Sequence, residues 1–495
     1  MSIANRMLQS SIWLYIGQWV GRLIGFVSTL ILARILTPDD FGVIASAMIV
    51  TNIFFVLSTT GMNEYLLRKK KIIDIELHTA WSINIILQCI VSFSIFFSAE
   101  LIANFFEDQR LIDVLRISAL VPIILSINNI GMLKFEKDLN YKPIFKITLL
   151  AQIFAFVTKI SLAYYLKSYW AFVIAELVDV SVRVICSYII CSFKPKFKFD
   201  NWKDQWRFSQ WMLAKGFFST IRYKIDNILI MKFFSSTALG IYTVSKDLAT
   251  LPAGQIITPM MKPLYVGLSN ELDNLSVFTD KVQKSIFATA MIIFPIAFGI
   301  SAVSSNLVNV LLGQQWLQAT PIVETISFIL LSGTLGTLLA HIYTILGRVK
   351  ESFILDVIVG GATIIVFIAA APFITFYNFA LLRVIFGIFV TLATFIYLKK
   401  FIPLNLIKIS ILLSLPLFSS LIMYFLITLF PDSNILLTQS YALILQIISG
   451  VLIYSTVSLF LIYLTKNRFN EVEFFFKTFV QLPVSKLKTL LFRHH

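Results

Sequence analysis

Several charged residues lie inside stretches of the sequence that are otherwise apolar. Arg22 stands near the middle of the first stretch, with Gln18 one helical turn before it. A charge at the bilayer centre costs about 2.5–3.5 kcal/mol on insertion scales, so a retained charge is expected to face a cavity or a partner. We therefore predict that Arg22 lines a polar cavity and that Gln18 supports it. A purely structural ion pair is the alternative role for Arg22.

The most charged apolar stretch covers residues 208–234 and contains Lys215, Arg222, Lys224 and Asp226. On a helix that turns about 100° per residue, Lys215, Arg222 and Asp226 share one face, and Lys224 points away. We predict that the three basic residues bind an anion and that Asp226 supports them. The alternative is an i, i+4 pair of Arg222 with Asp226 that only neutralises itself.

Further charges occur in neighbouring apolar stretches. Asp179 and Arg183 are four residues apart, which predicts a mainly structural pair on one helix face, and Lys159 and Lys246 add two buried bases. Because bases outnumber acids in these stretches, the interior should attract an anion. A diphosphate needs several positive donors, which arginine supplies as a bidentate fork and lysine as a point charge.

These charges belong to a membrane protein. The chain has 495 residues, of which 58% are apolar and 14% are charged, with a mean hydropathy of +0.85, whereas soluble domains are about 25% charged. This excludes a water-soluble enzyme. Apolar stretches of about 20 residues predict an all-α polytopic membrane protein with about 14 transmembrane helices. They lie near residues 10–32, 41–63, 78–99, 112–133, 144–166, 169–190, 208–234, 237–261, 285–312, 320–346, 352–375, 377–398, 406–429 and 441–464.

The distribution of Lys and Arg predicts how the chain is oriented. Predicted loops on the side of the N-terminus hold 27 of the 41 basic residues, and the opposite loops hold three, Arg34, Arg110 and Lys167. Cytoplasmic loops of membrane proteins carry the excess of positive charge. Both termini are therefore predicted to be cytoplasmic. The net charge of +15 follows from this topology, and no nucleic acid partner is predicted.

A basic segment divides the apolar stretches into two sets of six. Six helices per lobe is an even number, so both lobes start on the same side, which predicts a parallel pseudo-two-fold repeat. An offset of 198 residues between the halves matches Gly42 to Gly240. We predict an N-lobe at 1–191, a cytoplasmic linker at 192–207, a C-lobe at 208–400, two accessory transmembrane helices at 401–465 and a basic amphipathic cytoplasmic tail at 466–495.

The sequence contains no recognisable catalytic motif. It has no phosphate-binding G-x-x-x-x-G-K-[ST] and no H-E-x-x-H, and its four histidines and three cysteines form no cluster along the chain. We predict neither an enzyme, nor a metal site, nor a resident cofactor. Any driving force would then come from an ion gradient, with Na⁺ or H⁺ as the coupling ion, from the membrane potential, or from downstream consumption of a substrate.

Two runs of residues resemble the Wzx-type polysaccharide flippases of the multidrug/oligosaccharidyl-lipid/polysaccharide exporter superfamily. The first is Ala33-Arg34-Ile-Leu-Thr-Pro38-Asp-Asp-Phe-Gly42. The second is Arg222-Tyr-Lys-Ile-Asp-Asn-Ile-Leu-Ile-Met-Lys-Phe-Phe234, followed by Leu239-Gly-Ile-Tyr242 and Leu248-Ala-Thr-Leu-Pro252. The subgroup that the chain resembles exports lipopolysaccharide, colanic-acid-like or teichuronic-acid-like repeat units.

The resemblance implies two six-helix lobes, alternating access, and translocation of an undecaprenyl-diphosphate-linked oligosaccharide to the outer leaflet of the bacterial inner membrane. The polymer would be an O-antigen, a capsule or an exopolysaccharide. Family members carry a basic residue in the first span, matched by Arg22, and basic residues in the seventh, matched by Arg222 and Lys224. One departure is Asp247, which stands where a basic residue is expected, with the positive charge moved to Lys246. The shift turns that charge by about 100°.

Three alternatives remain open from the sequence. A drug or cation antiporter of the same superfamily would depend on an acidic residue, yet residues 10–32 contain none. A flippase for the peptidoglycan precursor would be essential for growth. A glycan polymerase or ligase would need a large outward loop with catalytic groups. The expected partners are the lipid-linked glycan, the bilayer, and a polymerase and chain-length regulator of the same pathway.

Overall fold

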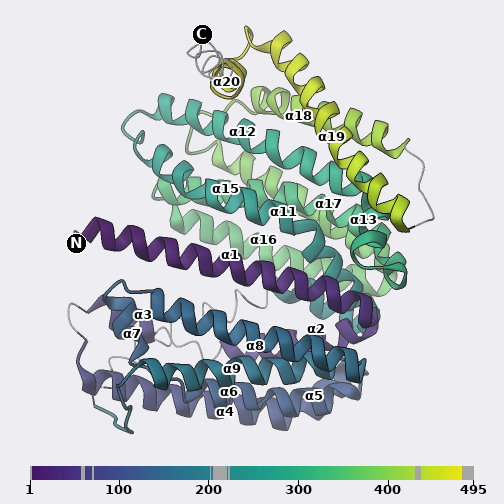
Figure 1. Ribbon diagram of the computed structural model, residues 1–495. Helices are drawn as coiled ribbons and strands as arrows, with labels where there is room; N and C mark the ends of the chain where they lie inside the picture. Colours follow the sequence, from purple (N-terminus) through teal and green to yellow (C-terminus); the bar gives the residue numbers. More distant parts are fainter. Residues whose placement is uncertain are drawn as a thin grey trace, which may run out of the picture. The chain divides into compact units, whose positions relative to one another are not determined.

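The computed structural model describes residues 3–56, 62–69, 72–200, 202–203, 220, 223–429 and 436–481, and most of them are helical (Figure 1). The all-α class predicted from the apolar stretches is therefore confirmed. The chain forms two compact units, Met1–Thr243 and Val244–His495.

Nine labelled helices form most of the first unit. They are α1 (Ile3–Ile35), α2 (Pro38–Val56), α3 (Met62–Arg68), α4 (Asp74–Phe106), α5 (Arg110–Ser118), α6 (Leu120–Ser126), α7 (Met132–Lys137), α8 (Lys142–Leu166) and α9 (Trp170–Ile190). Residues 223–233 are also helical, and α11 (Ser236–Ser269) starts in this unit and continues into the second.

Helix α8 holds the first unit together by packing along α9 on one side and α1 on the other. Small residues of α1 allow the second contact. A Cβ atom built on Gly17 would lie 3.1 Å from Cδ2 of Phe145, and one built on Gly21 would lie 2.7 Å from Nε2 of Gln152. Glycines spaced by four residues therefore let two membrane helices approach closely.

The second unit contains residues 244–269 of α11 and the remaining helices. They are α12 (Leu275–Ala302), α13 (Ser304–Leu311), η1 (Gln314–Ala319), α14 (Thr320–Ile326), α15 (Ile329–Ile345), α16 (Val349–Ala370), η2 (Ala371–Phe373), α17 (Phe376–Leu398), α18 (Leu406–Thr428), α19 (Leu436–Thr465), α20 (Asn470–Phe476) and η3 (Lys477–Gln481).

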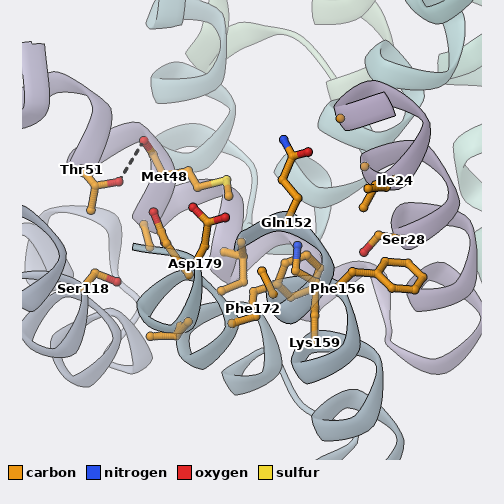
Figure 2. Close-up of a pocket in the computed structure, with 18 of the residues that line it drawn as sticks. Ile24, Ser28, Met48, Thr51, Ser118, Gln152, Phe156, Lys159, Phe172 and Asp179 are labelled. Carbon is orange, nitrogen blue, oxygen red and sulfur yellow. Dashed lines mark hydrogen bonds between the residues drawn. The ribbon is translucent and has the colours of Figure 1, made fainter. Parts of the chain in front are cut away.

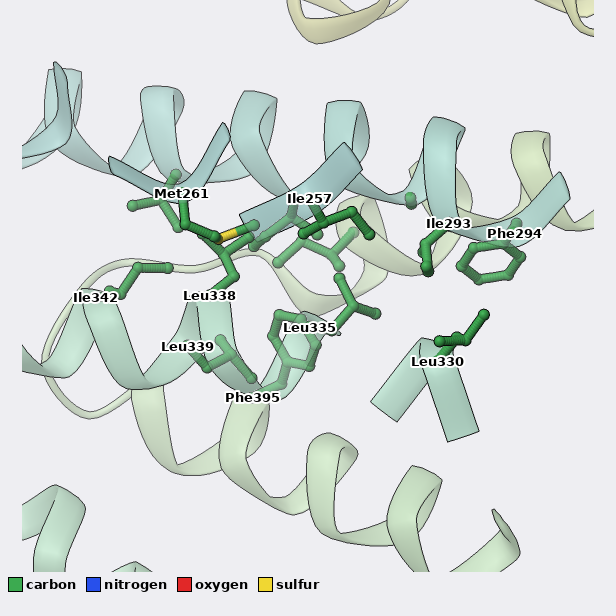
Figure 3. Close-up of a cluster of buried hydrophobic side chains, with 14 of the residues drawn as sticks. Ile257, Met261, Ile293, Phe294, Leu330, Leu335, Leu338, Leu339, Ile342 and Phe395 are labelled. Carbon is green, nitrogen blue, oxygen red and sulfur yellow. The ribbon is translucent and has the colours of Figure 1, made fainter. Parts of the chain in front are cut away.

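The core of the second unit lies where α11, α12, α15 and α17 meet. Figure 3 shows Ile257 and Met261 above Leu338, with Phe395 below. These side chains are almost fully buried. Such dense packing matters in a membrane protein, because lipid is as apolar as the core and helix association depends on close contact.

The membrane-spanning capacity of the described residues agrees with a polytopic protein. Nine helices are long and apolar enough to cross a membrane, and ten spans result if the bent pair Gln314–Ile326 and Ile329–Ile345 counts as one. Three other predicted spans also coincide with helices, namely α9, α11, and the interrupted pair α5 and α6. The predicted span 208–234 lies mostly outside the described residues.

The start of the predicted linker runs as extended backbone along the beginning of α4. The backbone N–H of Lys196 donates to Nδ1 of His78, and that of Lys198 donates to the Ser82 hydroxyl, at 3.0 and 2.9 Å. Thr79 exchanges hydrogen bonds with the backbone of Asp200. Asn129, between α6 and α7, also donates to the carbonyl of Phe193 at 2.7 Å. The start of the linker is thus attached to the first unit by side chains of α4 and of the α6–α7 connection.

The predicted C-terminal tail begins with a helix that is part of the second unit. Helix α20 packs against α12 and α19. Its Glu471 is fully buried, and its carboxylate lies 2.7 Å from Nζ of Lys408 at the start of α18. Residues 482–495 of the predicted tail lie outside the described part of the chain. The lobe, linker, accessory-helix and tail boundaries remain predictions.

Candidate functional site

A cavity of about 320 Å³ lies inside the first unit, between α1, α2, α5, α8 and α9 (Figure 2). Most of its walls are apolar, and four charged side chains line it: Lys159 on α8, and Glu176, Asp179 and Arg183 on α9. The volume is at the lower end of the range of about 300–1,000 Å³ that is common for small-molecule sites.

One wall of the cavity is a stripe of small residues on α1. Gly21, Gly25 and Ser28 line the space. A Cβ atom built on Gly25 would meet no atom within 4 Å, so this wall opens directly onto the cavity. The hydroxyl of Ser28 is buried and has no hydrogen-bond partner among the described residues.

Two of the four charges neutralise each other. Nε and Nη2 of Arg183 donate to the two carboxylate oxygens of Asp179, at 2.6 and 3.2 Å. Both residues are on α9, one helical turn apart, and both side chains are less than one-third exposed. A bidentate pair of this kind fixes both side chains at the edge of the cavity.

The other two charges keep their hydrogen-bonding groups available. Nζ of Lys159 lies 5.1 Å from the centre of the Phe172 ring, which is a cation–π distance. Among the described residues, neither Lys159 nor Glu176 forms an ion pair or a hydrogen bond, and the side chain of Glu176 is accessible from the cavity. Gln152 likewise presents an unbonded amide to this space (Figure 2).

Arg22 and Gln18 lie on an exposed face of α1 and do not line the cavity. Within the described part of the chain, Arg22 has no hydrogen bond or ion pair. Its guanidinium is therefore available to a ligand. The structure places it beside the glycine stripe, one residue from Gly21, and not within the stripe.

The other predicted residues are spread over both units. Lys224 is partly buried, and Asp226 is buried and accepts a hydrogen bond of 2.8 Å from the hydroxyl of Tyr242. Lys246 is partly buried on α11, in the second unit. Lys215 and Arg222 lie outside the described residues. The roles of all six predicted binding residues remain predictions.

The Thr-Pro-Asp-Asp sequence that follows Arg34 starts helix α2. Pro38 is the first helical residue. Its missing N–H breaks no hydrogen bond there, because the first N–H of a helix has no acceptor within the helix. The backbone N–H of Thr37 donates to the carboxylate of Asp40 at 3.0 Å, and the backbone N–H of Asp40 donates back to the Thr37 hydroxyl at 3.3 Å. This reciprocal pair is a capping box. The motif therefore has a local structural cause.

The two glycines matched by the repeat, Gly42 and Gly240, lie against each other. A Cβ atom on Gly42 would be 1.8 Å from the carbonyl oxygen of Ser236, and one on Gly240 would be 2.0 Å from that of Pro38. No side chain fits there without moving backbone. The start of α11 is thus in backbone contact with the start of α2, within the first unit.

A polar cluster surrounds this contact at the end of the unit where α1 ends. We call it the far-end cluster, and it consists of Asp39, Asp108, Arg110, Ser236 and Thr237. Arg110 forms ion pairs with Asp39 and Asp108 and donates to the Ser236 hydroxyl at 3.1 Å. Ser236 and Thr237 in turn donate to Asp39. Hydrogen bonds to Asp108 and Asp39 raise the pKa of Arg110 further above its ordinary value, so this arginine stays charged.

A second ion pair lies nearby. Nζ of Lys232 donates to the Glu107 carboxylate at 2.9 Å and to the carbonyl of Phe105 at 2.7 Å. The bond from Lys232 lowers the pKa of the Glu107 carboxyl. Residues 232–237 are therefore tied to the α4–α5 connection and to α2 by charged contacts.

A model of the family described as "Polysaccharide biosynthesis protein" matches residues 31–321, which is more than half of the chain. The chain belongs to this family. The predicted resemblance to Wzx-type polysaccharide flippases is confirmed, and the prediction that the protein is not an enzyme agrees with it.

Curated relatives of this polysaccharide biosynthesis protein have related names. It is 23% identical to the teichuronic acid biosynthesis protein TuaB of Bacillus subtilis (strain 168), over 66% of this chain and 69% of that protein. It is 21% identical to the lipopolysaccharide biosynthesis protein WzxC of Escherichia coli (strain K12), over 71% and 73%. The succinoglycan biosynthesis transport protein ExoT of Rhizobium meliloti (strain 1021) is 22% identical, over 60% of each chain.

Solved structures share the fold of this family member. The lipid II flippase MurJ in an inward closed conformation has a TM-score of 0.73 at 17% identity and covers 90% of this chain and 98% of its own. An inward-facing multidrug resistance transporter of the MATE family has a TM-score of 0.59 at 13% identity, over 81% and 98%. At these identities the likeness establishes the fold alone.

Sequence reasoning missed part of the site of this polysaccharide biosynthesis protein. Gln152 carries no charge, and only its position opposite Gly21 brings it to the cavity. The far-end cluster was also missed, although Asp39 lies inside the family motif and Arg110 is one of three basic residues in the predicted outward loops. Within the described residues, no group of three or more His, Cys, Asp and Glu side chains is placed to hold a metal ion.

Proposed function

We propose that this protein moves an undecaprenyl-diphosphate-linked oligosaccharide from the cytoplasmic to the outer leaflet of the bacterial inner membrane. The family match over residues 31–321 carries the proposal. It is supported by relatives named for teichuronic acid, lipopolysaccharide and succinoglycan biosynthesis. Helices long enough to span a membrane, and a mostly apolar cavity lined by four charged side chains, fit a transporter of an amphipathic substrate.

In this proposal the glycan head enters the protein and the polyprenyl tail stays in lipid. Arg22 and Lys224, which have no partner among the described residues, bind the diphosphate together with Arg222 and Lys215, while Lys246 and Lys159 add positive charge. The two lobes then alternate between inward and outward access. The cycle depends on a gradient of Na⁺ or H⁺, on the membrane potential, or on downstream consumption of the substrate. The substrate must bind the inward and outward states with different affinities, since a ligand shifts such an equilibrium only in this way.

The proposed setting also includes other proteins and a defined orientation. Both termini face the cytoplasm, as the distribution of Lys and Arg predicts. A polymerase and a chain-length regulator of the same pathway receive the repeat unit on the outer side. The fold neighbours are compatible with a peptidoglycan-precursor flippase or a drug antiporter, so the test must separate these functions.

The test is deletion of the gene followed by extraction of lipids from intact and permeabilised cells. We expect loss of one surface polymer, continued growth, and accumulation of an undecaprenyl-linked repeat unit that a water-soluble modifying reagent reaches only after permeabilisation. A plasmid copy should reverse all three effects. Arrest of growth with accumulated peptidoglycan precursor, or cation-dependent loss of dye efflux with normal surface polymer, would contradict the proposal.

A further inference from the structure

We propose that the cavity of the first unit, which contains Lys159, is a subsite for one uncharged pyranose ring of the glycan. It is separate from the four basic residues that bind the diphosphate directly, namely Arg22, Lys224, Arg222 and Lys215. This inference rests on the proposed function and names the chemistry that this part of the site recognises. It predicts that residues of α1, α8 and α9 bind the sugar ring.

The charged side chains that line the cavity balance in sign. Its lining contains two bases, Lys159 and Arg183, and two acids, Glu176 and Asp179. Since Asp179 already pairs with Arg183, the remaining charges are one ammonium and one carboxylate. A diphosphate needs several positive donors without a competing anion, and a sugar carboxylate would be repelled by Glu176. The lining therefore disfavours both anions.

The polar groups of the cavity include both hydrogen-bond donors and acceptors. The Glu176 carboxylate only accepts, the Lys159 ammonium only donates, and the Gln152 amide does both. These groups have no hydrogen-bond partner among the described residues. Because a sugar hydroxyl is both donor and acceptor, neighbouring hydroxyls on a ring can satisfy a carboxylate, an amide and an ammonium together. A ligand without such hydroxyls would leave these groups unsatisfied, which is costly in a low-dielectric site.

The apolar part of the cavity wall suits one face of a sugar ring. Phe156 and Phe172 lie beside Lys159 in Figure 2, and Met48 lies across the space. A pyranose ring has an apolar face of C–H groups that suits such side chains. A pocket with mostly apolar walls and a few convergent polar groups is the general form of a small-ligand site. The volume of about 320 Å³ fits a single ring better than a whole repeat unit.

The test measures binding of methyl pyranosides of gluco, galacto and manno configuration, and of the matching methyl uronides, to the full-length protein in lipid nanodiscs. Saturation-transfer difference NMR detects the weak binding expected of single sugars. We expect at least one neutral glycoside to bind the wild-type protein about tenfold more tightly than its uronide. Equal or tighter binding of the uronide, or binding of no glycoside, would overturn the proposal.

Two variants locate the binding. Glu176→Gln keeps the shape of the side chain and makes the cavity net positive, so the preference for the neutral glycoside over its uronide should fall by about tenfold. Gly25→Val should abolish binding by filling the space, since a Cβ atom there meets no protein atom. Gly333→Val is the matched control, because its Cβ is equally free and it lies on α15, outside the cavity. Unchanged binding in both cavity variants would show that the sugar binds elsewhere.

Failure of this inference is distinguishable from failure of the proposed function. If the subsite is wrong but the flippase assignment is right, the deletion strain still accumulates the undecaprenyl-linked unit, and Gly25→Val still exports it. If the flippase assignment is wrong, no such unit accumulates in the deletion strain, whatever the cavity binds.

Discussion

At the scale of single residues, some charged side chains of this protein form ion pairs with one another, and others are available to bind a ligand. Asp179 and Arg183 satisfy each other, and so do Arg110 and its two aspartates. Arg22 is exposed on α1 and has no such partner among the described residues. An unpaired guanidinium in a membrane helix is retained at a cost, and the cost is understandable if the group binds an anionic substrate.

We predict that Arg22→Glu abolishes export of the surface glycan without preventing folding or membrane insertion. The reason is that the substitution reverses the charge met by the diphosphate, while the exposed side chain loses no hydrogen bond or ion pair within the described structure. Surface glycan is measured by gel electrophoresis of cell extracts, and folding by the thermal unfolding midpoint in detergent.

Arg22→Lys is the matched control, because it keeps a positive charge but loses the bidentate fork. It should retain part of the export. Normal export by Arg22→Glu would remove this residue from the mechanism.

At the scale of elements, helix contacts depend on glycines that hydropathy alone does not distinguish. Gly17 and Gly21 let α1 approach α8, whereas Gly42 and Gly240 let α2 and α11 meet backbone to backbone. The latter pair sits inside the far-end cluster, so the close contact also positions Asp39 to accept from Ser236 and Thr237.

We predict that Gly42→Ala destabilises the protein by about 1–3 kcal/mol, the usual cost of overpacking. The added Cβ would fall 1.8 Å from the backbone carbonyl oxygen of Ser236, which a side-chain rotation cannot relieve. The measurement is a lower unfolding midpoint. Gly267→Ala on α11 is the control, since its Cβ meets nothing within 4 Å, and equal midpoints for the two variants would contradict the close contact.

The elements also show what the sequence could predict. Apolar stretches located the helices well, because transfer to lipid depends on composition. The predicted span 112–133 is not one continuous helix, because the helix is interrupted between α5 and α6. Pro122 has no N–H to donate to the carbonyl of Ser118, and its ring crowds that turn. The cavity was unpredictable, because Gln152 and Gly21 meet only through tertiary packing.

At the scale of the whole molecule, the charge bias between loops is the feature that relates the chain to the membrane. Most Lys and Arg lie in predicted loops on the side of the N-terminus. The direction of glycan transport proposed above requires that this side be cytoplasmic. The linker residue Lys196 and the loop residue Lys167, both exposed, belong to opposite sides in this topology and so provide a direct test.

We predict that Lys167→Cys reacts with a membrane-impermeant maleimide in intact spheroplasts, whereas Lys196→Cys reacts only after permeabilisation. Each variant is made in a chain whose Cys89, Cys186 and Cys191 are replaced by alanine, and that chain without a new cysteine is the control. The expectation follows from the positive-inside bias, which places the loop with Lys196 among the lysine-rich cytoplasmic ones. The reverse labelling pattern would mean that the protein has the opposite orientation in the membrane. Its cavity and its unpaired bases would then have to serve uptake, or a substrate that approaches from the outer side.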